Sequence, residues 1–107
     1  MMATTVDEAI EKMVERIVSG FSPVKIILFG SRARGDAHPD SDVDLLVVLP
    51  ACENRKAVTI SMMKSVADLP IGKDIVVTTT RELETRGNLA STVLYPAIRE
   101  GRVVYAR

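Results

Sequence analysis

Two short apolar runs rich in β-branched residues, Lys25–Phe29 and Val43–Leu49, flank a polar segment in the first half of the chain. Runs of this length, bounded by turn residues, are typical of strands that are buried on both faces. The polar segment begins with the pair Gly30–Ser31 and ends with the triplet Asp42–Asp44, which reads Asp-Val-Asp. The sequence therefore predicts two strands inside a sheet, with a glycine turn ending the first and two carboxylates opening the second.

The spacing of Asp42 and Asp44 suits a metal ion. Residues two apart on a strand lie roughly 6.5–7 Å apart and point to the same face, whereas Val43 between them points into the core. Two carboxylates about 4 Å apart repel by roughly 4 kcal/mol at an effective dielectric of about 20, and a divalent cation removes that repulsion. Mg²⁺ prefers oxygen ligands and is usually held by one or two carboxylates with substrate phosphates. The pair predicts a magnesium site for a phosphate-bearing substrate, such as a nucleoside triphosphate.

The Gly30–Ser31 pair suits the phosphates themselves. Glycine allows a sharp turn and a close approach of backbone to ligand, and serine adds a hydroxyl beside the N–H groups of a short helix expected to reach Arg34. Arg32 and Arg34 can add charge-assisted hydrogen bonds to phosphate oxygens, and in such a turn we expect only one of them to face the site. The other would face solvent or pair with Asp36 or Asp40.

A glycine-serine pair, ten intervening residues and then Asp-x-Asp resemble the signature of the nucleotidyltransferase superfamily that includes DNA polymerase beta. In so short a chain, the form Gly-Ser-Arg-Ala-Arg-Gly resembles the minimal nucleotidyltransferases, or MNT proteins, which are often encoded beside a HEPN-domain partner. The resemblance extends from about Val24 to Tyr105. It implies an α/β (α+β) fold of the polymerase-beta type, with a small mixed β-sheet and flanking helices. It also implies ATP as the donor substrate and a pair of Mg²⁺ ions as cofactors.

The third acidic residue of that superfamily lies on a neighbouring strand, and the resemblance assigns it to Asp74, which opens the expected strand Asp74–Thr79. Neighbouring strands lie about 4.8 Å apart, so a carboxylate on one can complete a cluster begun on the other. Asp74 would bind the second metal ion or accept the proton of the attacking hydroxyl. Asp68, at an expected helix end, is the alternative candidate.

Outside this motif, hydrophobic spacing and capping residues predict supporting elements. Helical spacing over Val58–Leu69, ended by Pro70, predicts a crossover helix between the strands that carry Asp44 and Asp74. The other expected elements are a helix from the Thr5–Glu8 capping box to Gly20, a short helix capped by Thr79, a helix over Asn88–Ile98 with a kink or break at Pro96, and an edge strand at Val103–Tyr105.

Length and composition restrict the function further. A chain of 107 residues fits one domain, spanning residues 1–107. Fourteen basic and fourteen acidic residues give a formal net charge of zero, which argues against a long nucleic acid as partner and favours a small nucleotide or a protein substrate. Cys52 is the sole cysteine, and no apolar stretch is long enough to cross a membrane, so we expect a cytoplasmic protein without disulfides.

Together with the family resemblance, these observations predict a Mg²⁺-dependent nucleotidyltransferase that transfers a nucleoside monophosphate to a hydroxyl of a partner protein. The family resemblance implies AMP from ATP, a HEPN-domain partner and the role of antitoxin. An alternative from another class is a non-catalytic nucleotide-binding antitoxin that neutralises its partner by contact. Retention of both Asp42 and Asp44 favours the enzyme, because a pure binding surface has no need for adjacent like charges. A third hypothesis, transfer to an RNA end, is weakened by the neutral charge.

Overall fold

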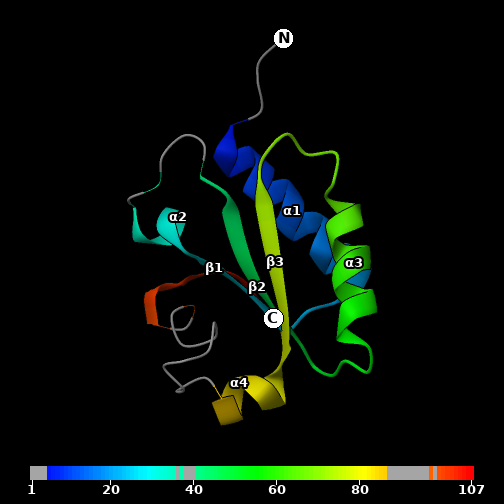
Figure 1. Ribbon diagram of the computed structural model, residues 1–107. Helices are drawn as coiled ribbons and strands as arrows, with labels where there is room; N and C mark the ends of the chain where they lie inside the picture. Colours follow the sequence, from blue (N-terminus) through cyan, green and yellow to red (C-terminus); the bar gives the residue numbers. More distant parts are fainter. Residues whose placement is uncertain (1–4, 36, 38–40, 87–96, 98) are drawn as a thin grey trace.

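Helices and strands alternate along the chain (Figure 1). The computed structural model describes residues 5–35, 37, 41–86, 97 and 99–107. The elements are, in order, α1 (Val6–Phe21), β1 (Lys25–Phe29), α2 (Ser31–Arg34), β2 (Val43–Leu49), α3 (Arg55–Ser65), β3 (Lys73–Thr79), α4 (Thr80–Arg86) and β4 (Arg102–Ala106).

The strands form one mixed sheet in the order β3-β2-β1-β4. β1 runs antiparallel to both β2 and β4, whereas β2 and β3 are parallel and are joined by the crossover helix α3. The two strands predicted from the apolar runs on either side of the polar segment, β1 and β2, have the expected bounds and occupy the centre of the sheet. β4 is an edge strand, as predicted. The expected fold, a small mixed sheet with flanking helices, is confirmed.

Side-chain alternation divides the core between the two faces of the sheet. On one face, alternate residues of the strands pack beneath α1 and α3, which lie side by side (Figure 1). Buried side chains on this face include Ile26, Leu28, Val43, Leu45, Val47, Ile75 and Val77. On the other face, Ile27 and Leu46 pack with Ala97 and with the half-buried Leu83 of α4. Val43 therefore points into the first core, as expected, and its neighbour Asp44 points to the opposite face.

α1 begins where the capping box predicts. The Thr5 hydroxyl accepts a hydrogen bond from the Glu8 N–H at 3.1 Å, and the helix then buries Ile10, Met13 and Ile17. It ends at Phe21, one residue beyond the expected end. Local spacing and capping were sufficient to predict this helix.

α3 differs from its prediction at both ends. It begins at Arg55, because the Asn54 side chain caps the N–H of Ala57, and it ends at Ser65 rather than at Leu69. The apolar spacing continues to Leu69, but the backbone after the helix follows tight turns that keep Val66 and Leu69 buried. Apolar spacing alone does not distinguish a last helical turn from such turns.

The Thr79 hydroxyl accepts a hydrogen bond from the Glu82 N–H and opens the predicted short helix α4. The helix predicted over Asn88–Ile98, with its break at Pro96, lies outside the described residues except at Ala97 and is therefore not tested. In the part of the chain that the structure describes, none of the helices has the length and apolar character needed to cross a bilayer.

Candidate active site

The predicted site residues meet at one edge of the sheet because of the strand register. Antiparallel pairing of β1 with β2 places Phe29 opposite Asp44, and parallel pairing of β2 with β3 places Asp44 opposite Asp74. The end of β1 and the starts of β2 and β3 therefore share an edge, with Gly30 directly beyond Phe29. The register brings Gly30, Asp44 and Asp74 together, as the sequence predicted.

Gly30 has two reasons to be glycine. Its φ of 77° is strained for residues with a side chain, and a Cβ at this position would collide with the carboxylate of Asp44. The Gly30 carbonyl accepts hydrogen bonds at 3.1 Å from the N–H groups of Ala33 and Arg34, which closes the first turn of α2 directly after the glycine. The glycine thus starts α2 with Ser31 while leaving space for the Asp44 side chain.

Asp42 is held at the same edge through a contact that the sequence analysis missed. The N–H of Val43 donates to the Gly72 carbonyl at 2.9 Å, and this bond brings Gly72 beside Asp42. A Cβ at Gly72 would collide with the Asp42 carboxylate. In the sequence, the only indication of this contact was a glycine, Gly72, directly before the strand that carries Asp74. That Gly72 lies against Asp42 becomes evident only when β2 and β3 pair.

The two arginines of α2 have different roles in the structure. The Arg32 guanidinium donates twice to the Ser41 carbonyl, from Nε at 3.1 Å and from Nη2 at 2.7 Å, and so holds the residue that precedes Asp42. Arg34 forms an ion pair with Glu100 at 3.4 Å, and its charge also acts on Asp44. Arg34 is thus the arginine of α2 whose charge lowers the pKa of Asp44. Pairing with Asp36 or Asp40 concerns positions outside the described residues.

The Asp44 carboxyl lies in an environment that disfavours its charged form. Its partial burial, followed by the charges of Asp74 and Asp42, raises the pKa of the Asp44 carboxyl, and Arg34 acts in the opposite direction. The carboxylates of Asp74 and Asp42 therefore lie close enough to Asp44 to oppose its ionisation.

The donor set at this edge fits magnesium. Within the described residues, no group of three His, Cys, Asp or Glu side chains is already arranged as a closed metal site. Mg²⁺ does not require one, because one or two carboxylates and substrate phosphates usually complete its coordination. The three side chains offer carboxylate oxygens, which Mg²⁺ prefers to nitrogen or sulfur. The roles assigned to Asp42, Asp44 and Asp74 remain predictions.

Asp68, the alternative third acid, belongs to a different part of the molecule. Its carboxylate pairs with the Arg16 guanidinium of α1, which also donates to the Ser65 carbonyl at 3.1 Å. The hydrogen bond from Arg16 lowers the pKa of the Asp68 carboxyl. This pair joins α1 to the end of α3, so Asp74 is the better placed candidate. Lys73, beside it, directs its Nζ to the carbonyls of Leu69 and Ile71 at 2.9 Å.

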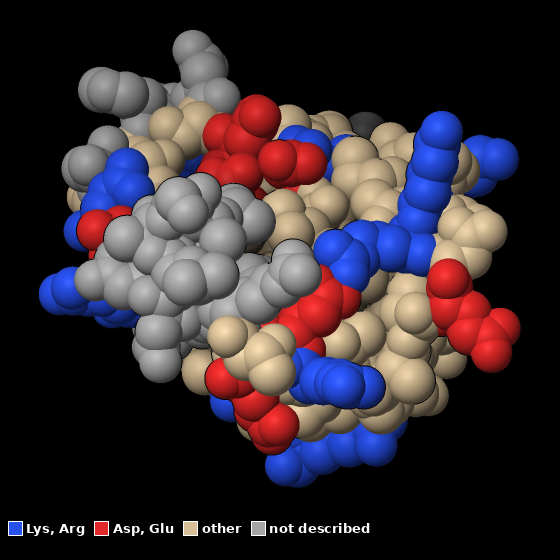
Figure 2. Space-filling model, turned by 60° about the horizontal axis from the view of Figure 1, so that its bottom comes forward, with Lys and Arg blue, Asp and Glu red and all other residues tan. Residues whose placement is uncertain are grey.

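The surface charges agree with the neutral composition. On the face shown in Figure 2, outside the grey region, acidic and basic side chains are interspersed and form no continuous basic surface. That face therefore does not show the continuous basic surface typical of proteins that track long nucleic acids.

Comparison with protein families decides the classification. The nucleotidyltransferase domain family matches residues 10–94, which contain every predicted site residue from Gly30 to Asp74. The chain belongs to this family. The resemblance drawn from the glycine-serine pair and Asp-x-Asp is thereby confirmed, and the edge formed by β1, β2 and β3 is the candidate active site of a nucleotidyltransferase domain.

Solved structures show the same fold. A nucleotidyltransferase from Sulfolobus solfataricus aligns over 100% of this chain and 91% of its own, with 22% identity and a TM-score of 0.58. A toxin-antitoxin with AMP-PNP aligns over 91% of this chain and 73% of its own, with 22% identity and a TM-score of 0.61. A double Asp-to-Glu variant of the toxin-antitoxin MntA-HpeT aligns over 94% and 73%, with 20% identity and a TM-score of 0.54. Among curated proteins, none matches the chain significantly.

Proposed function

We propose that this protein transfers AMP from ATP to a hydroxyl of a partner protein, that the partner is a HEPN-type toxin, and that the transfer neutralises it. The observation that carries the proposal is the register that aligns Asp44 with Asp74 beside the Gly30 turn. Membership of the nucleotidyltransferase family supports the reaction class. The neutral charge supports a protein acceptor over a long nucleic acid.

The solved structures support the choice of donor and partner. One similar protein is a toxin-antitoxin with AMP-PNP, and another is the MntA-HpeT pair. The minimal nucleotidyltransferases, which this sequence resembles, are expected beside HEPN partners. A two-component system is therefore the setting in which we place this chain.

In the proposed reaction, Ser31 and the backbone that follows Gly30 bind phosphate oxygens of ATP, and Arg34 adds positive charge near them. Asp42 and Asp44, with Asp74, would hold Mg²⁺, and a bound Mg²⁺ supplies Lewis-acid stabilisation of negative charge on the phosphates. The acceptor oxygen forms a bond to the α-phosphorus while the bond from that phosphorus to the bridging oxygen breaks, and pyrophosphate leaves. Asp74 either accepts the proton of the acceptor hydroxyl or completes the metal site.

Intact-mass spectrometry of the partner, after incubation with this protein, ATP and Mg²⁺, tests the proposal. We expect one or more added AMP units with the wild type and none with Asp42→Asn or after chelation of the metal. If the partner is inhibited without a change in mass, and Asp42→Asn inhibits it equally well, the contact-only antitoxin replaces the enzyme.

A second measurement separates chemistry from binding. If Asp74 acts on the acceptor proton, Asp74→Asn should lower the rate of transfer much more than it weakens ATP binding, because that proton moves only in the transition state. Ser31→Ala should instead weaken ATP binding. Unchanged turnover in Asp74→Asn would remove Asp74 from the site.

A further inference from the structure

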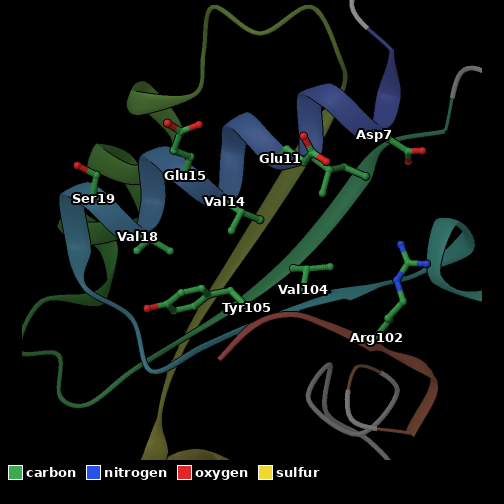
Figure 3. Close-up of a pocket in the computed structure, with 10 residues that line it drawn as sticks. Asp7, Glu11, Val14, Glu15, Val18, Ser19, Arg102, Val104 and Tyr105 are labelled. Atoms are coloured by element: carbon green, nitrogen blue, oxygen red, sulfur yellow. The ribbon is translucent and has the colours of Figure 1, made fainter. Parts of the chain in front are cut away.

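A groove of about 810 Å³ lies between α1 and the edge strand β4, away from the carboxylates of the candidate active site (Figure 3). Its floor is apolar. Val14 and Val18 point from α1 towards Val104 and Tyr105 of β4, and all four side chains are half-buried. Among the described residues, these apolar side chains of α1 and β4 are only partly covered on this face of the sheet.

The groove lies where a further helix could pack beside α1 on the sheet. α1 and α3 cover the same face of the sheet. On one flank of α1, Arg16 donates to the carbonyl of Ser65, the last residue of α3, and pairs with Asp68 in the turns that follow α3. The groove follows the opposite flank of α1, above β4. A helix placed there would lie beside α1 and on the sheet, as α3 does. A β-strand would instead extend the outer edge of β4 and leave the groove open.

The rim of the groove is acidic on the helix side. Asp7, Glu11 and Glu15 are exposed, follow one another at four-residue spacing and form a row beside the apolar row of α1. Residues four apart lie on the same helix face, so this row runs along the groove. Arg102 is the basic residue of the lining and lies at one end (Figure 3). An occupant with basic residues along one flank would complement this rim.

The same charges argue against other occupants. A second copy that docked its own α1 in this groove about a twofold axis would place carboxylates against carboxylates. Nucleic acid would bring its phosphates to the acidic row. Hydrophobic floor and acidic rim together fit an amphipathic helix with a basic flank, the type of ligand that docks in a groove through apolar residues at helical spacing.

We propose that the groove between α1 and β4 binds an amphipathic, basic-flanked helix of a partner protein. At its Asp7 end the groove adjoins a smaller cavity that shares Asp7 and Arg102 and is also lined by Arg32 and Gly35 of the α2 region. A partner held in the groove is thereby brought close to the nucleotidyltransferase edge of the sheet. Only this last step, delivery of an acceptor, rests on the proposed function.

Two designed helical peptides with the same apolar face, one with a lysine flank and one with a glutamate flank, test the proposal. Binding is followed by amide chemical-shift changes in the full chain, without nucleotide. We expect the lysine-flanked peptide to bind and to shift amides of both α1 and β4. The double variant Glu11→Lys/Glu15→Lys should weaken binding of the lysine-flanked peptide about tenfold, because each exposed ion pair contributes modestly and charge reversal makes the pairs repulsive. The same variant should strengthen binding of the glutamate-flanked peptide.

The matched control is Glu53→Lys/Glu84→Lys, which changes the net charge equally at exposed positions outside the groove and should leave both affinities unchanged. The proposal is overturned if the lysine-flanked peptide does not bind at about millimolar concentration, or if Glu11→Lys/Glu15→Lys leaves both peptide affinities unchanged. It is also overturned if the chemical-shift changes are confined to β4, or if sedimentation detects a dimer of the chain whose stability this variant alters. ATP binding measured in the same variant should equal that of the wild type, so failure of the groove and failure of the nucleotidyltransferase site are distinguishable.

Discussion

Asp68 and Asp44 have the same side chain but lie in opposite electrostatic environments. The exposed Asp68 carboxylate pairs with Arg16, and this hydrogen bond lowers its pKa. The half-buried Asp44 carboxylate has Asp74 and Asp42 as neighbours, and burial with these like charges raises its pKa. At the junction of α1 and α3 the fold itself neutralises a negative charge. At the edge of the sheet it gathers negative charges that do not help folding.

This contrast separates a structural carboxylate from a candidate functional one. The Asp44 carboxylate lowers the stability of the fold, yet strand pairing holds it in a defined position. Destabilising charged groups in defined positions are typical of ligand-binding and catalytic sites. The Asp68 pair needs no ligand to explain it. Substitutions in the two regions test this distinction.

The largest effect is expected for Asp44→Asn. This substitution removes one charge from the cluster and one candidate metal ligand, so transfer should fall by at least about 100-fold. The melting temperature measured in the presence of chelator should rise, because burial of a charge beside like charges is relieved. Transfer assays and thermal melts of the same preparations provide the two measurements.

Asp68→Asn is the matched control for that comparison, since it changes the same side chain in the other region. It should retain wild-type transfer. If Asp44→Asn kept full activity, or if both variants lost activity equally, the distinction between the two regions would be wrong.

A substantial effect is expected for Gly72→Ala. The added Cβ would collide with the Asp42 carboxylate, so this side chain must move, and we expect transfer to fall about tenfold or more. Gly20→Ala tests the same change where nothing lies within 4 Å of the new Cβ. It should leave transfer unchanged and stabilise α1 by about 0.5–1 kcal/mol. Equal activities of the two variants would show that the position of Asp42 is unimportant.

A smaller effect is expected for Arg32→Ala. Loss of both hydrogen bonds to the Ser41 carbonyl should loosen the start of β2 and lower transfer by a factor of about ten or less, through the position of Asp42 rather than through metal affinity. Arg32→Lys keeps one donor and should recover part of the activity. If Arg32→Ala weakens ATP binding as much as it lowers transfer, Arg32 contacts the nucleotide instead.

The smallest effect concerns pH and stability. The pKa of Asp68 is lowered from 3.8, so its stabilising contribution is fully present above 3.8 and is lost as the pH falls through the lowered pKa. The pKa of Asp44 is raised from 3.8, so its ionisation begins to destabilise the fold above 3.8, and the cost is complete above the raised pKa. The two carboxylates therefore contribute opposite slopes to the stability curve.

Melting temperatures of the wild type, Asp68→Asn and Asp44→Asn, measured with chelator from pH 7 down to below 3.8, check these signs. The loss in Asp68→Asn should be a few degrees at most at neutral pH, as is usual for exposed pairs, and should vanish in acid. The gain in Asp44→Asn should also vanish in acid. If Asp68 and Asp44 changed the stability in the same direction with pH, the contrast between their environments would be wrong.

Much of the architecture was predictable from the sequence because it depends on local rules. Two β-branched runs predicted β1 and β2 with their bounds, and the capping pair Thr5–Glu8 predicted the start of α1. The alternation that separates Asp44 from Val43 needs only the two-residue period of a strand. These features are fixed by residues close together in the chain.

Other features were decided only by the tertiary structure, because they join residues far apart in the chain. Alignment of Asp44 with Asp74 requires the pairing of β2 and β3, and the same pairing places Gly72 against Asp42. α3 ends at Ser65, and the turns that follow it keep Leu69 buried against the core. The sequence by itself determined which residues could bind phosphate and metal, through their chemistry and spacing. Strand pairing decided which carboxylates share one edge, and packing of α1 on the sheet decided which apolar side chains were left to line a groove.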